Sequence, residues 1–215
     1  MLKTNLVNQI YELIVKKIIS SDLKMGEKII ISSIAKEYHV SSTPVREALN
    51  KLTKEGLVEN IPNVGNFVFK LNENDTEEIL YIRELLESSS LKYTLLKEDN
   101  EIFIKLLNEF YELKREKDQS EIRKRFHDLD TLLHLSIIKS TSNRRLLEMY
   151  ERVFNILFVF ILKIHHSEKY YGQNFDHCIK LLEGIVSKDY VEAKRFLEIH
   201  FNYTRNNLKN YFNSL

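Results

Sequence analysis

The chain has 215 residues, of which 43% are hydrophobic and 29% charged, with 5 Gly and 2 Pro. This composition is typical of globular proteins and excludes collagen-like, disordered and low-complexity chains. The scarcity of Gly and Pro disfavours an all-β fold, which needs many turns. Cys178 is the single cysteine, which excludes a disulfide framework and fits the reducing conditions of the cytoplasm. No apolar run approaches the roughly 20 residues of a bilayer span, so we expect no membrane partner.

The charge is unevenly distributed along the chain. Residues 1–70 carry 10 Lys or Arg and 7 Asp or Glu, a net charge of +3, whereas residues 71–215 carry 22 and 24, a net charge of −2. A mildly basic first part and a mildly acidic second part are consistent with nucleic-acid binding by the first part only.

The first 70 residues predict a winged helix-turn-helix. Apolar residues recur at helical spacing in three segments, and two β-prone runs separated by turn residues follow them. The expected elements are helices over 4–20, about 32–38 and 43–56, and a hairpin whose strands 57–61 and 66–69 flank the loop 62–65.

The rest of the chain predicts helices alone. We therefore expect a mostly α protein, with a winged helix-turn-helix domain over 1–70, a linker over 71–76 and an antiparallel all-α bundle over 77–215. Polar or glycine-containing breaks, including Tyr171–Gly172, separate six helical patterns. These cover roughly residues 75–97, 100–117, 119–141, 144–166, 173–187 and 189–212.

The first turn of the third predicted helix carries the chemistry of a DNA contact. Ser41, Ser42 and Thr43 offer hydroxyls beside the free N–H groups of a helix N-terminus, which suit phosphate oxygens. Arg46, one turn further on, can reach a phosphate or a guanine edge. Gly65, at the hairpin tip, lets the backbone approach the duplex closely.

The same residues also fit a winged helix that binds protein instead of DNA. In that alternative, Arg46 pairs with Glu47 or Glu12 on a solvated face. The residue patterns by themselves leave both interpretations open.

Several motifs of the first domain occur together in one known family. Residues 43–49 read TPVREAL, residues 55–58 read EGLV and residues 62–65 read PNVG. This combination resembles the N-terminal domain of the GntR superfamily of bacterial transcription regulators. The resemblance implies that Thr43, Arg46 and Gly65 contact operator DNA.

Two positions depart from the family pattern. Members commonly carry Arg where this chain has Ser32 and Ser42, and those arginines typically contact the operator. Their absence is expected to weaken binding, because each phosphate contact adds to affinity and to its salt dependence. We hypothesise that Lys28, Lys36 and Lys51 compensate.

One Asp and three His in the second domain have the residue types of a metal site. Asp130 and His134 are spaced i, i+4, which puts both on one helix face, and His177 and His200 follow on later helices. Three imidazoles and a carboxylate suit Zn, Ni, Mn or Fe. Each histidine alone is more often an ordinary core or surface group, so the spacing leaves the metal site open.

The second domain also resembles a known one, the FCD effector domain of the FadR branch of GntR regulators. The resemblance implies a divalent metal ion held by Asp130, His134, His177 and His200. It also implies a small carboxylate effector. Arg83 is placed either to bind that carboxylate as a guanidinium fork or to pair with Glu87 at i+4, and both remain open. The matching positions are residues 83–87, Asp130, His134, Asn143, Asp176, His177 and His200.

From these resemblances we expect a cytoplasmic, homodimeric transcription regulator, more often a repressor than an activator, that binds double-stranded operator DNA. A small organic acid bound at the metal-containing bundle would control it. In an alternative, the divalent ion is itself the signal. A metalloenzyme using metal-bound water is disfavoured because no general base is identifiable near the four ligands, so we expect no enzyme.

Overall fold

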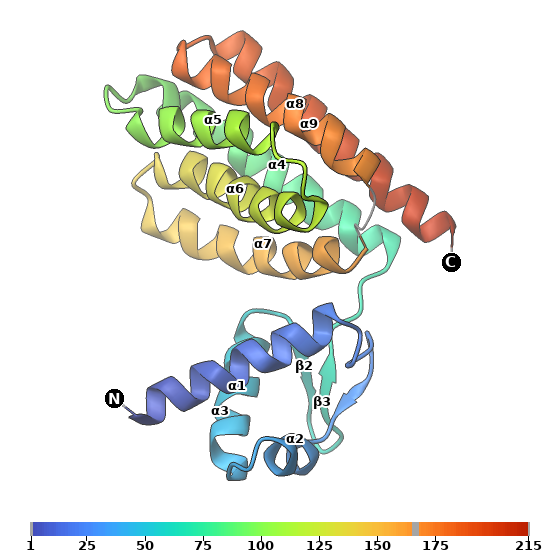
Figure 1. Cartoon of the computed structure of the whole chain (residues 1–215). Helices are drawn as coiled ribbons and strands as arrows, with labels where there is room; N and C mark the ends of the chain where they lie inside the picture. The colour runs from blue at the N-terminus through green and yellow to red at the C-terminus, as the bar shows by residue number, and fades with distance from the viewer. Residues whose placement is uncertain (1, 165–167, 215) are drawn as a thin grey trace. The chain divides into compact units, whose positions relative to one another are not determined.

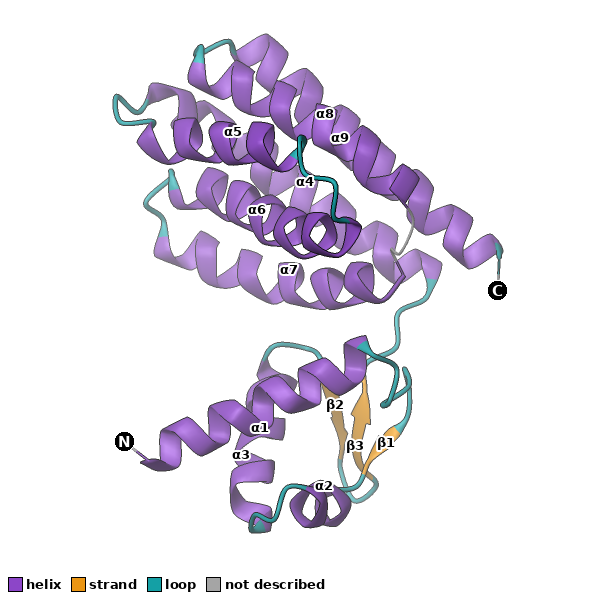
Figure 2. Cartoon of the chain, viewed as in Figure 1, coloured by secondary structure: helices purple, strands orange, loops and turns teal. Residues whose placement is uncertain are grey.

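Helices dominate the structure, a computed structural model that describes residues 2–164 and 168–214, and the predicted mostly α class is confirmed (Figure 1). The described residues divide into two compact units. The first contains the chain up to Asn72 together with Glu151–Ile164, and the second contains Glu73–Tyr150 and the residues after Ile164. The strands of the described chain all belong to the first unit, as the orange arrows in Figure 2 show.

The first unit confirms the predicted winged helix-turn-helix. A small antiparallel sheet of order β1-β3-β2 forms the wing, with Val58 opposite Val68 and Ile61 opposite Gly65. The elements are helices α1 (Leu2–Ile19), α2 (Ile31–Glu37) and α3 (Ser42–Lys54), and strands β1 (Lys28–Ile29), β2 (Val58–Ile61) and β3 (Gly65–Val68).

Helices α1 and α3 pack together through the apolar stripes that predicted them. Ile10, Ile14 and Ile18 recur every fourth residue of α1, and each is at most 1% exposed. Leu49 and Leu52 are buried to the same degree on α3. Fully burying a side chain of this size contributes about 1.5–3 kcal/mol, so this contact anchors α3.

Strand β1 was not predicted. Lys28 pairs with Phe67 and Ile29 with Asn66. Two residues are too few for an alternating pattern to be visible in sequence, and pairing with β3 alone makes the segment a strand.

The second unit confirms the predicted helical bundle. None of the described helices is long and apolar enough to cross a bilayer. The helices are α4 (Glu73–Leu96), α5 (Glu101–Leu113), α6 (Gln119–Lys139), α7 (Arg144–Ile164), α8 (Glu168–Val186) and α9 (Tyr190–Asn213); α7 contributes residues to both units.

Two expected boundaries differ from the structure. Helix α4 begins at Glu73, inside the expected linker 71–76, because Glu73 and Asp75 in its first turn favour the positive end of the helix dipole. Helix α8 runs through Gly172, where we expected a break, since an isolated glycine costs only about 1 kcal/mol in a helix. The expected end of the fourth bundle helix at residue 166 lies outside the described residues.

Helices α8 and α9 approach each other closely. A Cβ added to Gly184 of α8 would lie 2.6 Å from the backbone N of Ala193 in α9. The Asp189 carboxylate accepts a hydrogen bond from the Glu192 backbone N–H and so caps the start of α9. This close packing fixes the two helices that face α6 and α4 in the bundle core.

Candidate DNA-contact surface and candidate metal centre

The N-terminus of α3 is exposed and its polar groups are available. Ser41 is the N-cap residue in an extended conformation, and its side chain makes no capping hydrogen bond. The side chains of Ser41, Ser42 and Thr43 are exposed. Because the first N–H groups of a helix have no intrahelical partner, this terminus is suited to an anion such as a DNA phosphate.

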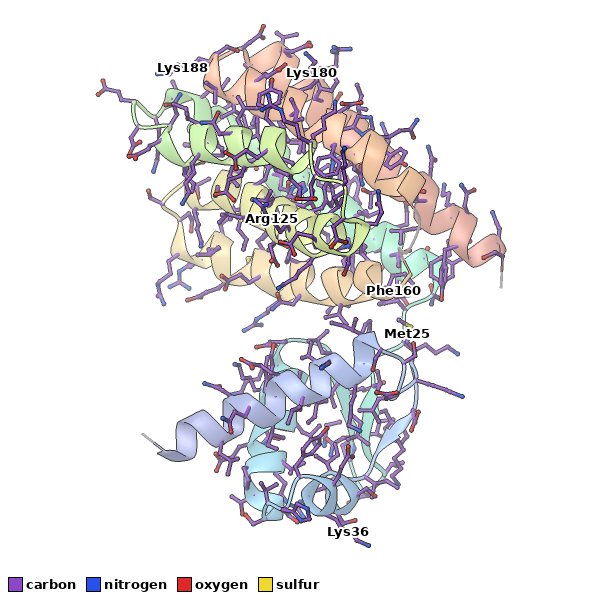
Figure 3. All side chains as sticks on the ribbon, viewed as in Figure 1. Met25, Lys36, Arg125, Phe160, Lys180 and Lys188 are labelled. Carbon is purple, nitrogen blue, oxygen red and sulfur yellow. The ribbon has the colours of Figure 1, made fainter. Side chains whose placement is uncertain are left out.

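Arg46 is exposed on α3, one turn beyond that terminus. Within the described residues its side chain makes no ion pair, so the alternative pairing with Glu47 or Glu12 is not seen. Ser32 is exposed on α2, and Lys36 extends outward from the same helix (Figure 3).

Gly65 opens β3 at the tip of the wing. Its φ of +136° lies in a region that favours glycine, and an added Cβ would come within 2.9 Å of the Lys28 side chain. The exposed Lys28 ammonium lies 6.0 Å from the centroid of the Phe67 ring. The wing tip therefore lies beside the positively charged Lys28 side chain.

Asp130, His134 and His200 come together inside the bundle. The Nε2 atoms of His134 and His200 are 3.1 Å apart. These two atoms lie 3.6 and 3.7 Å, respectively, from Oδ1 of Asp130. Both imidazoles are buried, and the three side chains come from α6 and α9. Two imidazole nitrogens and a carboxylate oxygen this close form a donor set of the kind that binds a divalent metal ion.

His177, the fourth expected ligand, is not joined to this cluster by any contact of the described residues. Its ring packs edge-on against Tyr203, with the centroids 5.3 Å apart. The next residue, Cys178, points into the cluster instead, with Sγ 3.5 Å from Asp130 Oδ1 and 3.8 Å from His200 Nδ1. One residue turns a helix by about 100°, and the packing of α8 directs Cys178, not His177, inward.

Glu87 holds the His134 ring from the other side. Glu87 Oε2 accepts a hydrogen bond from His134 Nδ1, and the Glu87 side chain is completely buried. This bond places the proton on Nδ1 and leaves Nε2 to face Asp130 and His200. A carboxylate in this position fixes the tautomer and orientation of a metal-ligating histidine. The sequence analysis placed Glu87 in the matching stretch 83–87 and as a partner of Arg83, but not as a partner of His134.

Arg83 pairs with Glu87, the second of the two arrangements that the sequence left open. Its Nη2 donates to Glu87 Oε1 over 3.1 Å, and the Tyr150 hydroxyl donates to the same oxygen over 2.5 Å. The Arg83 side chain is 5% exposed and also lies over the Phe201 ring. The guanidinium is thus engaged within the protein and buried.

The buried charges shift one another's pKa values. Burial alone would lower the pKa of His134, but the Glu87 and Asp130 carboxylates outweigh it and raise the value to about 9. Burial lowers the pKa of His200 to about 4. Burial, reinforced by Asp130, raises the pKa of the Cys178 thiol. Without metal, His134 is therefore protonated and His200 neutral at neutral pH, which lets His134 Nε2 donate to His200.

Two further polar residues beside the cluster in sequence were missed. Thr131 follows Asp130 on α6, and Asn174 precedes Cys178 by one turn of α8. The Thr131 hydroxyl and both amide atoms of Asn174 are buried, as is Nδ1 of His177, and none has a hydrogen-bond partner among the described residues. Each such group costs about 1–3 kcal/mol, so their presence calls for a bound polar molecule or water.

An exposed helix N-terminus followed by a β-wing is the architecture of a winged-helix DNA-binding domain, and the same chain folds a helical bundle with a buried polar centre. The profile described as bacterial regulatory proteins, gntR family, matches residues 6–68, and the FCD domain profile matches residues 78–203. The chain therefore belongs to the GntR family and carries an FCD domain. Members are transcription regulators and not enzymes, in agreement with the expectation from sequence.

Known proteins are similar to this chain over most of its length. An uncharacterised HTH-type transcriptional regulator of Bacillus subtilis, YdhC, is 27% identical over 94% of this chain and 90% of its own length. The gluconate operon transcriptional repressor of the same organism is 28% identical over 87% and 77%. The structure of E. coli McbR/YncC superposes with a TM-score of 0.76 at 18% identity, covering 96% of this chain and 98% of that one.

Proposed function

We propose that this chain is a homodimeric repressor whose affinity for a near-palindromic operator is controlled by a small organic acid. The observation that carries the proposal is the exposed, uncapped N-terminus of α3, with Arg46 one turn further on. In a dimer, two such helices reach successive major grooves, and dimer geometry sets the half-site spacing. Because its target is operator DNA, we place the protein in the cytoplasm.

We further propose that the FCD domain binds a divalent metal through Asp130, His134 and His200. The fit rests on three convergent donor atoms and on Glu87, which presents His134 Nε2 to them. Because the pKa of His134 is raised, its Nε2 carries a proton in the metal-free protein. This proton must leave when a metal ion binds to Nε2. A bound ion would supply a positive centre for a carboxylate.

The effector site proposed here differs from the one expected at Arg83. Since Arg83 is paired with Glu87, we assign the polar contacts to the effector to Thr131 and Asn174, whose buried groups lack partners. An organic acid is of the same chemical class as the gluconate in the name of the Bacillus subtilis relative. An effector acts only if it binds the two DNA-affinity states of the protein differently.

One series of measurements tests these proposals. The operator is first selected from a random DNA pool, and native mass spectrometry with elemental analysis gives subunit number and metal content. Chelator-treated protein on labelled operator is then titrated with Zn²⁺ and afterwards with a panel of small organic acids. We expect the acid, and not the metal alone, to change operator affinity. A change on metal alone would make the ion the signal, and a monomer without operator preference would contradict the proposal.

Two variants assign the effector contacts. Asn174→Leu and Thr131→Val remove the polar atoms with little change of volume. We expect both to retain metal and operator binding and to lose the response to the acid by about tenfold or more, the effect of one lost hydrogen bond to a charged group. An unchanged acid response in both variants would contradict the assignment.

A further inference from the structure

We infer that Cys178 is a thiolate ligand of the metal ion, adding a sulfur donor to the oxygen of Asp130 and the nitrogen of His200. The inference rests on the metal site proposed above and extends it to a residue type that the expected Asp-His-His-His set lacks. Its basis is the position of the sulfur beside Asp130 Oδ1 and Nδ1 of His200.

The donor atoms of Asp130, Cys178 and His200 all lie within 4.8 Å of one another. The Cys178 side chain is completely buried on α8, and Sγ faces Asp130 Oδ1 at 3.5 Å. A weak S–H donor is an unusual partner for a buried carboxylate, because it compensates little of the cost of removing that charge from water. A cation between the two would satisfy both.

The neighbouring histidine is the competing ligand. His177 Nδ1 is buried without a hydrogen-bond partner among the described residues, but its ring lies against Tyr203 of α9. On α8, His177 and Cys178 differ by about 100° in direction, so a rotation of the helix that turned His177 inward would bury a different face. The close contact between Gly184 and Ala193 opposes such a rotation.

A thiolate changes which metal the site prefers. Binding breaks the S–H bond, forms a metal–sulfur bond and releases the proton to solvent. Sulfur and imidazole donors favour Zn²⁺ and Co²⁺, whereas Mg²⁺, Ca²⁺ and Mn²⁺ prefer oxygen-rich sites. We therefore assign the site to a zinc-class ion and expect manganese to be displaced from it by zinc.

The decisive experiment is cobalt substitution of the tag-free, full-length protein. Chelator-treated protein is titrated with Co²⁺ while its absorption is recorded. We expect visible ligand-field bands together with a strong sulfur-to-cobalt charge-transfer band in the near ultraviolet, at one equivalent per chain. Because the chain has a single cysteine, a thiolate band can arise only from Cys178.

Two variants separate the possible ligands. Cys178→Ser should lose the charge-transfer band. Its Zn²⁺ affinity should fall by more than the roughly 10- to 100-fold that follows removal of a residue that only supports a ligand. His177→Ala is the matched control and should keep both the band and the affinity. Ligand-field bands without a charge-transfer band in the wild type would overturn the inference and leave the metal site standing. Failure of cobalt to bind at all would overturn both.

X-ray absorption of the zinc-loaded wild type gives an answer that does not depend on how well the variants fold. We expect one sulfur neighbour at about 2.3 Å among nitrogen and oxygen neighbours at about 2.0–2.2 Å. A first shell of nitrogen and oxygen alone would refute the thiolate ligand.

Discussion

The winged helix and the bundle place their charged side chains in opposite environments. Arg46 and Lys28 are exposed on the winged helix. In the bundle, Arg83, Glu87 and His134 are buried and satisfy one another. Removing an exposed charge leaves nothing unpaired, whereas removing one member of a buried network leaves its partners uncompensated. Substitutions in the two regions should therefore separate DNA binding from stability.

The largest effect is expected from Glu87→Ala. This variant removes the carboxylate shared by Arg83 and His134, and we expect the free energy of unfolding to fall by about 3–5 kcal/mol in urea denaturation. Glu84→Ala is the control, since Glu84 pairs with the more exposed Arg205 and should cost less than about 1 kcal/mol. Equal losses in the two variants would show that burial of the network does not set its importance.

Arg46→Ala should act on binding alone. We expect operator affinity measured by fluorescence anisotropy to fall by about 1–3 kcal/mol while the thermal midpoint stays unchanged. Lys54→Ala, at the opposite end of α3, is the matched loss of an exposed charge and should have little effect. If Arg46→Ala weakens binding to random DNA equally, Arg46 contacts a phosphate and not a base edge.

Metal affinity should depend on pH because His134 must lose a proton. Its pKa of about 9 in the metal-free form means that the proton competes with the metal at all lower pH values. We expect affinity to rise by at least about tenfold per pH unit through neutrality. It should keep rising above the pKa of His134 if the Cys178 thiol, whose pKa burial raises, must also lose its proton. Isothermal titration calorimetry in buffers of different ionisation enthalpy would count the released protons. A zinc affinity that is constant across neutral pH would contradict a protonated His134.

The smallest effect is expected from Ser42→Arg, which restores an arginine common in the family. One added phosphate contact should steepen the dependence of log affinity on log salt by about 0.9, with only a small gain in affinity. Ser20→Arg adds the same charge at the end of α1 and is the control. Identical slopes for the two variants would mean that residue 42 does not face the DNA backbone.

Most helices were predictable because their cores repeat at helical spacing. Helix α1 was predictable because Ile10, Ile14 and Ile18 form one apolar stripe. The start of α3 was predictable from the residues of its first turn. Strand β1 could not be predicted, since two residues carry no pattern and only pairing with β3 defines it. A helix or strand can be predicted from its local sequence when burial of its own side chains supplies most of the stabilising free energy.

The site was only partly predictable for a related reason. Asp130 and His134 share one turn of one helix, so their spacing alone places them side by side. Whether Arg83 meets an effector or Glu87 depends on Tyr150 and on other residues far along the chain. No local pattern records such a contact.

The sequence by itself determined two domains, the exposed first turn of α3, and the pairing of Asp130 with His134. The tertiary structure decided that Cys178 faces that pair and His177 does not. Adjacent residues on a helix differ by about 100° in direction, and the rotation of α8 is set by its packing against α9, α5 and α6 together. Because this rotation depends on packing against three other helices, it cannot be predicted from the sequence of α8 alone.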